Sequence, residues 1–218
     1  MDIEQIKTAL DNEDPQQRMR GIRELRNYDA DVATPLLLEH VGDQEFLVRS
    51  FVAMGLGRKQ SEAAFAALLK MINQDSDPNV RAEAANSLSF YGEPAVTPLR
   101  QMYESDEHWL VRRSVIAAMA ELNRPQELRE ICEIGLSGQD EPVKESCISA
   151  LSLLANTEQQ SAALQILLSL IKDESWRIRL QVAKALSQYN QPEARASLNQ
   201  LKTDADHRVV GAVLETLV

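Results

Sequence analysis

The sequence predicts an all-α fold, an α-solenoid of about seven two-helix repeats. The first supporting observation is composition: Ala, Leu, Gln, Glu, Arg and Ser dominate, and the 218 residues include only eight Gly and eight Pro. Such a balance favours helix over strand. The second and third observations are a repeat of just over 30 residues and an apolar stripe with helical spacing inside each repeat. Together they are typical of stacked helical hairpins.

A recurring seven-residue stretch marks the repeat. It occurs as DQEFLVR at 43–49, as DEHWLVR at 106–112 and as DESWRIR at 173–179. We take its last residue as the anchor of each repeat. Equivalent anchors follow one another at intervals of 31 to 35 residues: Arg18, Arg49, Arg81, Arg112, Lys144, Arg179 and Val210.

Each anchor lies in the second helix of its repeat. Apolar residues one position before the anchor and three, four and seven positions after it form one face of an α-helix. The position seven after the anchor is apolar in every repeat: Leu25, Leu56, Leu88, Met119, Leu151, Leu186 and Leu217. This stripe predicts the hydrophobic core.

A first helix precedes each anchor, as the apolar spacing in 65–72 and 164–171 indicates. Asp14-Pro15 and Asp77-Pro78 are typical of an N-cap followed by proline at the first helical position. One hairpin cannot bury its apolar face alone, so the hairpins should stack in series. We therefore predict a single solenoid over residues 1–218. Its repeats should span about 1–29, 30–60, 61–92, 93–123, 124–156, 157–190 and 191–218.

The arrangement resembles HEAT repeats, in which Pro, an Asp eight residues later and an Arg six residues after that recur. Pro35, Asp43 and Arg49 have this spacing, and 98, 106 and 112 repeat it. The short period and the D-x-x-W-x-V-R pattern are most similar to the HEAT-like repeats of phycobilin lyases. Those enzymes attach or transfer linear tetrapyrroles, and related proteins assist phycobilisome degradation.

This resemblance implies a structural ladder. In HEAT-like stacks the Asp between the two helices caps the second helix and also pairs with the Arg of a neighbouring repeat. The residues predicted to form the ladder are Asp43, Asp75, Asp106 and Asp173 with Arg49, Arg81, Arg112 and Arg179.

The net charge limits the classes of partner. Thirty-three acidic residues against 23 basic ones give −10, which argues against nucleic acid, because Lys and Arg hold phosphate backbones. The opening MDIEQIKTAL lacks the basic and apolar parts of a signal segment, and we find no apolar run long enough for a membrane. With only two cysteines, we expect a cytoplasmic protein in a reducing compartment.

Catalytic signatures are missing from the sequence. There is no P-loop, dinucleotide loop or H-E-x-x-H motif. Metal-dependent HEAT hydroxylases use several His-Glu pairs, whereas this chain has only the reversed pair Glu107-His108. Cys147 occupies a core position, and Cys132 lies in the preceding helix. We therefore predict no catalytic residue, no metal and no obligatory cofactor.

The face for binding a partner is expected on the second helices, which line the concave side in this family. Positions two, five and nine after the anchor lie off the core stripe. In the first three repeats they include Arg, Phe and Met, which are enriched at protein interfaces. The predicted partner-binding residues are Arg20, Arg23, Phe51, Met54, Arg58, Asn86 and Phe90. An ordinary solvated face with Arg stems lying over apolar surface is the alternative.

Two functions from different classes remain open. The first is a non-catalytic scaffold that holds a protein partner on this face. The second, which the family resemblance alone implies, is a bilin-handling protein that takes a linear tetrapyrrole. The last repeat ends at Val218 directly after an apolar core position. We therefore also expect self-association through the C-terminal repeat or fraying of that end.

Overall fold

The structure is a computed structural model that describes residues 1–216. In this part of the chain there are fourteen α-helices, three short 3-10 helices and no strand, so the predicted all-α fold is confirmed. The α-helices are α1 Ile3–Leu10, α2 Pro15–Glu24, α3 Ala30–Leu38, α4 Phe46–Lys59, α5 Glu62–Gln74, α6 Pro78–Leu88, α7 Val96–Ser105, α8 Trp109–Glu121, α9 Pro125–Ser137, α10 Glu141–Ser152, α11 Gln160–Ser169, α12 Trp176–Leu186, α13 Pro192–Leu201 and α14 His207–Glu215. The 3-10 helices are η1 Leu25–Asn27, η2 Ser89–Tyr91 and η3 Glu93–Ala95.

The helices form seven consecutive pairs, and each predicted repeat segment contains one pair. We call the odd-numbered helix of each pair the A helix and the even-numbered one the B helix. Internal packing divides the chain into two compact units, Met1–Leu122 and Asn123–Val218, which we call unit 1 and unit 2. The boundary falls between the fourth and fifth hairpins.

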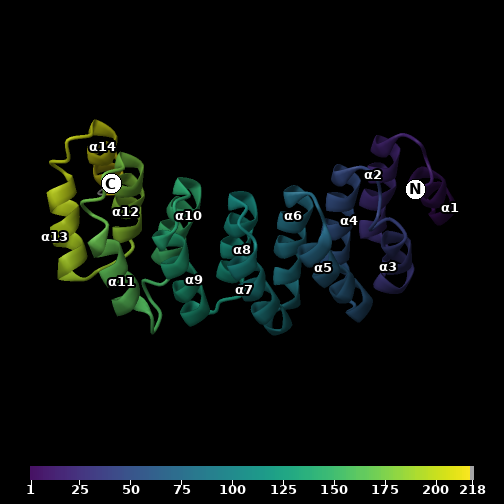
Figure 1. The fold of residues 1–218 in the computed structure, drawn as a ribbon, viewed down its shortest axis with the longest axis horizontal. Helices are drawn as coiled ribbons and strands as arrows, with labels where there is room; N and C mark the ends of the chain where they lie inside the picture. Colours follow the sequence, from purple (N-terminus) through teal and green to yellow (C-terminus); the bar gives the residue numbers. More distant parts are fainter. Residues whose placement is uncertain (217–218) are drawn as a thin grey trace. The chain divides into compact units, whose positions relative to one another are not determined.

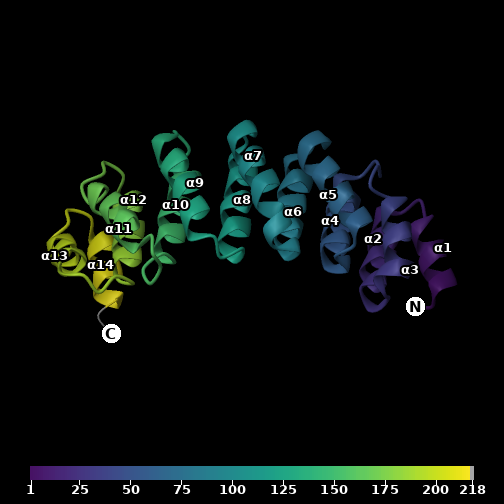
Figure 2. The same cartoon turned by 90° about the horizontal axis from the view of Figure 1, so that it is seen from below.

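Unit 1 is a stack of four hairpins. Its B helices α2, α4, α6 and α8 pack on one another in chain order, as Figure 1 shows and the turned view in Figure 2 supports. Each A helix packs against the B helix of its own hairpin. The result is a continuous face of B helices and a second layer of A helices.

Unit 2 repeats this arrangement with three hairpins. Its B helices α10, α12 and α14 pack in series, and α9, α11 and α13 each contact the B helix of the same hairpin. In both units, therefore, each B helix packs on the B helix of the next hairpin.

The predicted apolar stripe forms the core of both units. Residues one before the anchor, such as Val48 and Val111, are fully buried, and so are the residues seven after it, such as Leu56 and Leu186. Burial of these side chains is the main favourable contribution to folding. The predicted core residue Leu217 and the end at Val218 lie outside the described residues, so the expectation for the C-terminal end stays a prediction.

The helix starts follow the capping chemistry of the sequence. The Asp14 carboxylate accepts a hydrogen bond from the Gln16 amide, and Asp77 accepts one from the Asn79 amide; proline follows each cap. These bonds satisfy amide groups that have no partner inside the helix. None of the helices in residues 1–216 combines the length and apolar character needed to cross a membrane.

Candidate functional site

An ion-pair ladder runs along unit 1 at the junctions between A and B helices. The anchor arginines of the first three repeats each donate two hydrogen bonds to the junction Asp of the next repeat. The Arg49 guanidinium contacts the Asp75 carboxylate at 2.7 and 2.9 Å, and a third nitrogen hydrogen donates to the Asp43 carbonyl. The pairs in unit 1 are Arg18–Asp43, Arg49–Asp75 and Arg81–Asp106.

The ladder carboxylates are nearly buried, and they also order the loops. The Asp75 side chain is 7% exposed and accepts a hydrogen bond from the Asp77 amide at 2.9 Å. Burial alone would raise the pKa of Asp75, but the hydrogen bonds from Arg49 and Asp77 and the charges of Arg49 and Arg81 lower it overall. The ladder therefore fixes the register between hairpins, with each Asp in its charged form.

The predicted ladder is interrupted at two of its residues. Arg112 donates to the Asp106 carbonyl, but the junction position of the next repeat is Gly138, which has no carboxylate. Asp173 accepts from the Ser175 amide, and within residues 1–216 it forms no ion pair with Lys144, whose single ammonium replaces the forked guanidinium. The ladder resumes in unit 2 with the pair Arg179–Asp204.

Two ladder residues were missed in the sequence, Arg18 and Asp204. Both were detectable, since Arg18 is the first anchor and Asp204 precedes the anchor position 210 by six residues. The ladder is a structural feature, and its arginines are already occupied by carboxylates and carbonyls.

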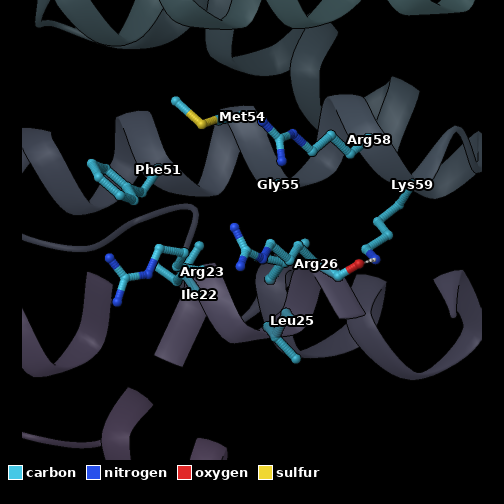
Figure 3. A pocket seen from close by; sticks show the side chains of 10 residues that line it. Ile22, Arg23, Leu25, Arg26, Phe51, Met54, Gly55, Arg58 and Lys59 are labelled. Carbon is cyan, nitrogen blue, oxygen red and sulfur yellow. Dashed lines mark hydrogen bonds between the residues drawn. The ribbon is translucent and has the colours of Figure 1, made fainter. Parts of the chain in front are cut away.

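A pocket between the B helices α2 and α4 is a different kind of feature. Its volume is about 180 Å³. It brings together four of the predicted partner-binding residues, Arg23, Phe51, Met54 and Arg58 (Figure 3). The remaining lining residues are Leu25, which was predicted as a core residue, and Ile22, Arg26, Leu37, Gly55 and Lys59, which were not among the predicted partner-binding residues. We call this site the α2–α4 pocket.

The floor of the α2–α4 pocket is apolar and its rim is cationic. Ile22, Leu25 and Leu37 are buried in the floor. In Figure 3, Arg23 and Arg26 extend from the end of the first hairpin, and Arg58 extends from the facing helix α4. The pocket therefore presents positive charge on both of its walls.

The rim arginines are exposed. In residues 1–216 the guanidinium groups of Arg23, Arg26 and Arg58 form no hydrogen bond and no ion pair, in contrast to the ladder arginines. An unpaired guanidinium presents five donors in a planar fork that matches a carboxylate. Three such groups around one apolar cavity can bind an anion that also has an apolar part.

Two further residues shape the walls. The Lys59 ammonium donates to the backbone carbonyls of Arg26, at 3.3 Å, and of Tyr28, which fixes the end of α4 against η1 (Figure 3). Burial lowers the pKa of Lys59. Gly55 allows Leu37 to reach the cavity, because a Cβ atom at position 55 would lie 2.9 Å from a Leu37 methyl carbon.

The other predicted partner-binding residues lie outside this pocket. Arg20 is exposed on α2 and does not line the cavity, whereas Asn86 lies on α6 and Phe90 on the following η2. Phe90 is 56% exposed. Glu83 on α6 lies close enough to Arg58 for their charges to interact: burial raises the pKa of Glu83, and the charge of Arg58 opposes that shift.

Thiol or metal chemistry has little support in the described chain. Cys132 and Cys147 are both buried, and a hydrogen bond with the Cys147 thiol, together with burial, raises the pKa of Cys132 well above its ordinary value. A thiol in that state is a poor nucleophile. Within residues 1–216 no group of three or more His, Cys, Asp and Glu side chains is placed to hold a metal ion.

The hairpins, the B-helix stack and the Asp–Arg ladder together define an α-solenoid repeat protein. A family model of HEAT repeats matches residues 34–120 and 128–218, so the chain belongs to the HEAT-repeat family.

Curated relatives match part of the chain. Deoxyhypusine hydroxylase-B of Oryza sativa subsp. japonica is 31% identical over 123 residues, which is 55% of this chain and 41% of the relative. Deoxyhypusine hydroxylase of Gallus gallus is 33% identical over 103 residues, 46% of this chain and 34% of the relative. The chain thus spans about two fifths or less of the length of the curated relatives it matches.

Two solved structures share the fold. The structure of YibA from Escherichia coli aligns with a TM-score of 0.69 at 17% identity, over all of this chain and 86% of YibA. The complex of CpcE and CpcF of phycocyanin lyase from Nostoc sp. PCC7120 aligns with a TM-score of 0.57 at 15% identity, over all of this chain and 95% of that one. The resemblance to the repeats of phycobilin lyases is thereby confirmed as a likeness of fold.

Proposed function

We propose that the chain is a non-catalytic scaffold that binds a protein partner on the B-helix face of unit 1. The observation behind this proposal is the α2–α4 pocket, where three unpaired guanidinium groups surround an apolar floor. The chain as a whole has a net charge of −10, so the positive charge around this pocket is opposite in sign to the charge of the chain. Electrostatic complementarity of this kind steers and selects partners.

The size of the pocket favours a protein partner over a small molecule. Small-molecule sites usually enclose about 300–1,000 Å³, whereas this cavity is about 180 Å³. A cavity of this size suits one apolar side chain of a partner, which is how anchor residues occupy interfaces. Half-buried Phe51 and Met54 on α4 would supply apolar contacts around it.

A bilin-handling protein is the second candidate. The observation that favours it is the same combination of cations and aromatic surface, because a linear tetrapyrrole joins carboxylates to flat apolar rings. The likeness of fold to the phycocyanin lyase complex suggests the comparison. The small cavity would hold only a part of such a molecule. Mixing the chain with phycocyanobilin should give no red-shifted bound band under the scaffold proposal, and a band lost in Phe51→Ala would favour the bilin.

A hydroxylase activity, which the names of the curated relatives suggest, is not part of the proposal. The family resemblance associates that activity with several His-Glu pairs. The described residues supply only the reversed Glu107-His108 and no group able to hold a metal ion. The residues present therefore do not fit the metal of those enzymes.

Site-specific photo-cross-linking tests the scaffold proposal. A benzophenone amino acid replaces Phe51 in one variant and Gln181, the same repeat position in unit 2, in a matched control. In a lysate of the source organism, position 51 should cross-link one protein that mass spectrometry identifies, and position 181 should not. Reversing charge with Arg23→Glu and Arg58→Glu should reduce that product by about tenfold. Equal products at both positions, or none at 51, would contradict the proposal.

A further inference from the structure

The B-helix face of unit 1 continues beyond the α2–α4 pocket onto the next hairpin. Phe90 follows α6 and is 56% exposed. Its carbonyl accepts a hydrogen bond from the Gln60 side chain at 2.9 Å, just beyond the end of α4. This bond fixes Phe90 next to the helix end that bears Arg58. The face therefore has two apolar contact points, the pocket and Phe90, and α4, the helix that bears Arg58, borders both of them.

The separation of these points follows from helix packing. Neighbouring helices lie about 8–10 Å apart. The pocket lies between α2 and α4, and Phe90 follows α6, so the two points are about one and a half helix spacings apart, roughly 12–15 Å. An extended chain rises about 3.3 Å per residue, so about four residues cover this distance.

Residues an even number apart lie on the same side of an extended chain. A side chain at position i that enters the pocket is therefore on the same side as those at i+2 and i+4. The residue at i+2 would lie opposite Arg58, and the residue at i+4 would lie on Phe90. The residue at i−2 would lie on the other side of the pocket, towards Arg23 and Arg26.

Resting on the proposed function, we infer that the partner contributes an extended acidic segment with the pattern acidic-x-apolar-x-acidic-x-apolar. The first apolar residue fills the α2–α4 pocket, the second packs on Phe90, and the carboxylates pair with the free guanidinium groups. Charge complementarity determines this choice of occupant, because the guanidinium groups of Arg23, Arg26 and Arg58 form no hydrogen bond or ion pair in residues 1–216. A helix, about 10–12 Å across, would cover the pocket rather than follow it.

Glu83 should weaken binding of the acidic segment. It is half-buried on α6 and close enough to Arg58 for the two charges to interact. Its carboxylate competes with the acidic residue at i+2 for Arg58. Removing that charge should therefore strengthen binding of the segment, whereas removing an unrelated acidic residue should not.

The test measures fluorescence anisotropy of the full chain with labelled synthetic peptides. Each peptide has one Leu flanked by Asp at both i−2 and i+2 in a Ser/Gly background. A Phe follows the Leu at spacings of three, four, five or eight residues. We expect the tightest binding at spacing four, with about fivefold weaker binding at three and five. The Phe90→Ala variant should bind the peptides of all four spacings equally. It should retain the weaker binding that the Leu and its two flanking Asp residues provide.

Charge variants provide the second readout. Arg58→Gln should weaken the best peptide about fivefold, Glu83→Gln should strengthen it about twofold, and Lys184→Gln, which removes a cation that lines the corresponding groove of unit 2, should leave it unchanged. A best spacing of eight would indicate a helical segment and overturn the inference, as would equal binding at all spacings or no binding. A cross-linked partner at position 51 would still stand in those cases, so this failure is distinguishable from failure of the proposed function.

Discussion

The same groove between consecutive B helices exists in both units, but its chemistry differs. In unit 1 it is the α2–α4 pocket, with an apolar floor and unpaired arginines. In unit 2 the groove between α10 and α12 measures about 320 Å³ and is lined mainly by short or uncharged side chains. Its lining residues are Ser149, Ser152, Leu153, Gln181, Lys184, Ala185 and Gln188. The position of Phe51 in one unit is Gln181 in the other.

This difference separates two sets of positions in the repeat. Within residues 1–216 the stripe at the anchor minus one, plus three, plus four and plus seven is buried in both units and maintains the fold, apart from half-buried Gln17 in the first repeat and exposed Leu214 in the last. Positions two, five and nine after the anchor lie off that stripe and vary without loss of the hairpin. Function in this chain is therefore expected where the off-stripe positions are distinctive, since sites are built onto a fold rather than determined by it.

The ladder differs between the units as well. Unit 1 has three Arg–Asp pairs between its four hairpins, whereas unit 2 has one pair between its three hairpins. Stability in repeat proteins is approximately a sum over hairpins and the interfaces between neighbours. The ladder should therefore contribute more to unit 1 than to unit 2.

The largest effect is expected from removing a ladder arginine. Arg49→Ala leaves the Asp75 carboxylate, 7% exposed, without its guanidinium. The free energy of unfolding of unit 1 should fall by about 3–5 kcal/mol, because an uncompensated charge then remains buried. Lys144→Ala, at the equivalent position of unit 2, should cost about 0.5 kcal/mol or less.

Each unit contains one of the two tryptophans, so the units can be followed separately. Trp109 reports on unit 1 in a Trp176→Phe background, and Trp176 reports on unit 2 in a Trp109→Phe background. Urea denaturation monitored by fluorescence then gives the two free energies. Equal losses for Arg49→Ala and Lys144→Ala would show that the ladder does not distinguish the units.

A smaller effect is expected from glycines in B helices. Gly57 on α4 lies against α6, where an added Cβ atom would be 2.7 Å from the Ser87 Cβ atom. Gly57→Ala should therefore destabilise unit 1 by about 1–3 kcal/mol through overpacking. Gly211 on α14 has no atom within 4 Å of such a Cβ, so Gly211→Ala should stabilise unit 2 by up to about 1 kcal/mol. The same two tryptophan backgrounds measure both changes, and a neutral Gly57→Ala would refute close packing of α4 on α6.

Acid should affect unit 1 more than unit 2. The folded state lowers the pKa of Asp43, Asp75 and Asp106 in unit 1, and that of Asp204 and the surface residue Asp206 in unit 2. A lowered carboxyl pKa gives stability that is complete above the ordinary Asp value of about 3.9 and is lost as pH falls through the folded pKa. The ion pair of Asp206 with the exposed Arg208 lies within one hairpin and contributes little.

The urea midpoint of unit 1 should therefore decrease more steeply than that of unit 2 as the pH falls from about 5 towards 3. Glu83, whose pKa is raised by burial, acts in the opposite direction, and Glu83→Gln removes its contribution. Arg49→Ala should flatten the acid dependence of unit 1, since its loss removes one cause of the shift at Asp75. Parallel pH profiles for the two units would contradict this account.

The sequence predicted the hairpins and their core because both depend on local periodicity. A residue such as Leu56 occupies the same helical position as Leu88 one repeat later, and both are fully buried. The resemblance to HEAT-like stacks implied the ladder, because the Asp and Arg residues of this chain recur at the positions that pair in that family. The division into two units was not predicted, although Gly138 interrupts the ladder pattern near the boundary.

The α2–α4 pocket could be predicted only in part. The B-helix positions indicated Arg23, Phe51, Met54 and Arg58, because they lie off the apolar stripe. Leu37 comes from an A helix, and its access depends on Gly55, so the floor required the three-dimensional packing of two hairpins. The repeat spacing in the sequence does not predict how closely one hairpin packs against the next.

Hydrogen exchange of the full chain, with and without the acidic peptide of spacing four, tests the central claim most directly. The claim is that the groove between B helices binds in unit 1 and not in unit 2. We predict slower exchange in residues 20–27 and 51–60 on addition of the peptide, and unchanged exchange in residues 146–153 and 181–188. Equal protection of both grooves, or protection confined to unit 2, would contradict it.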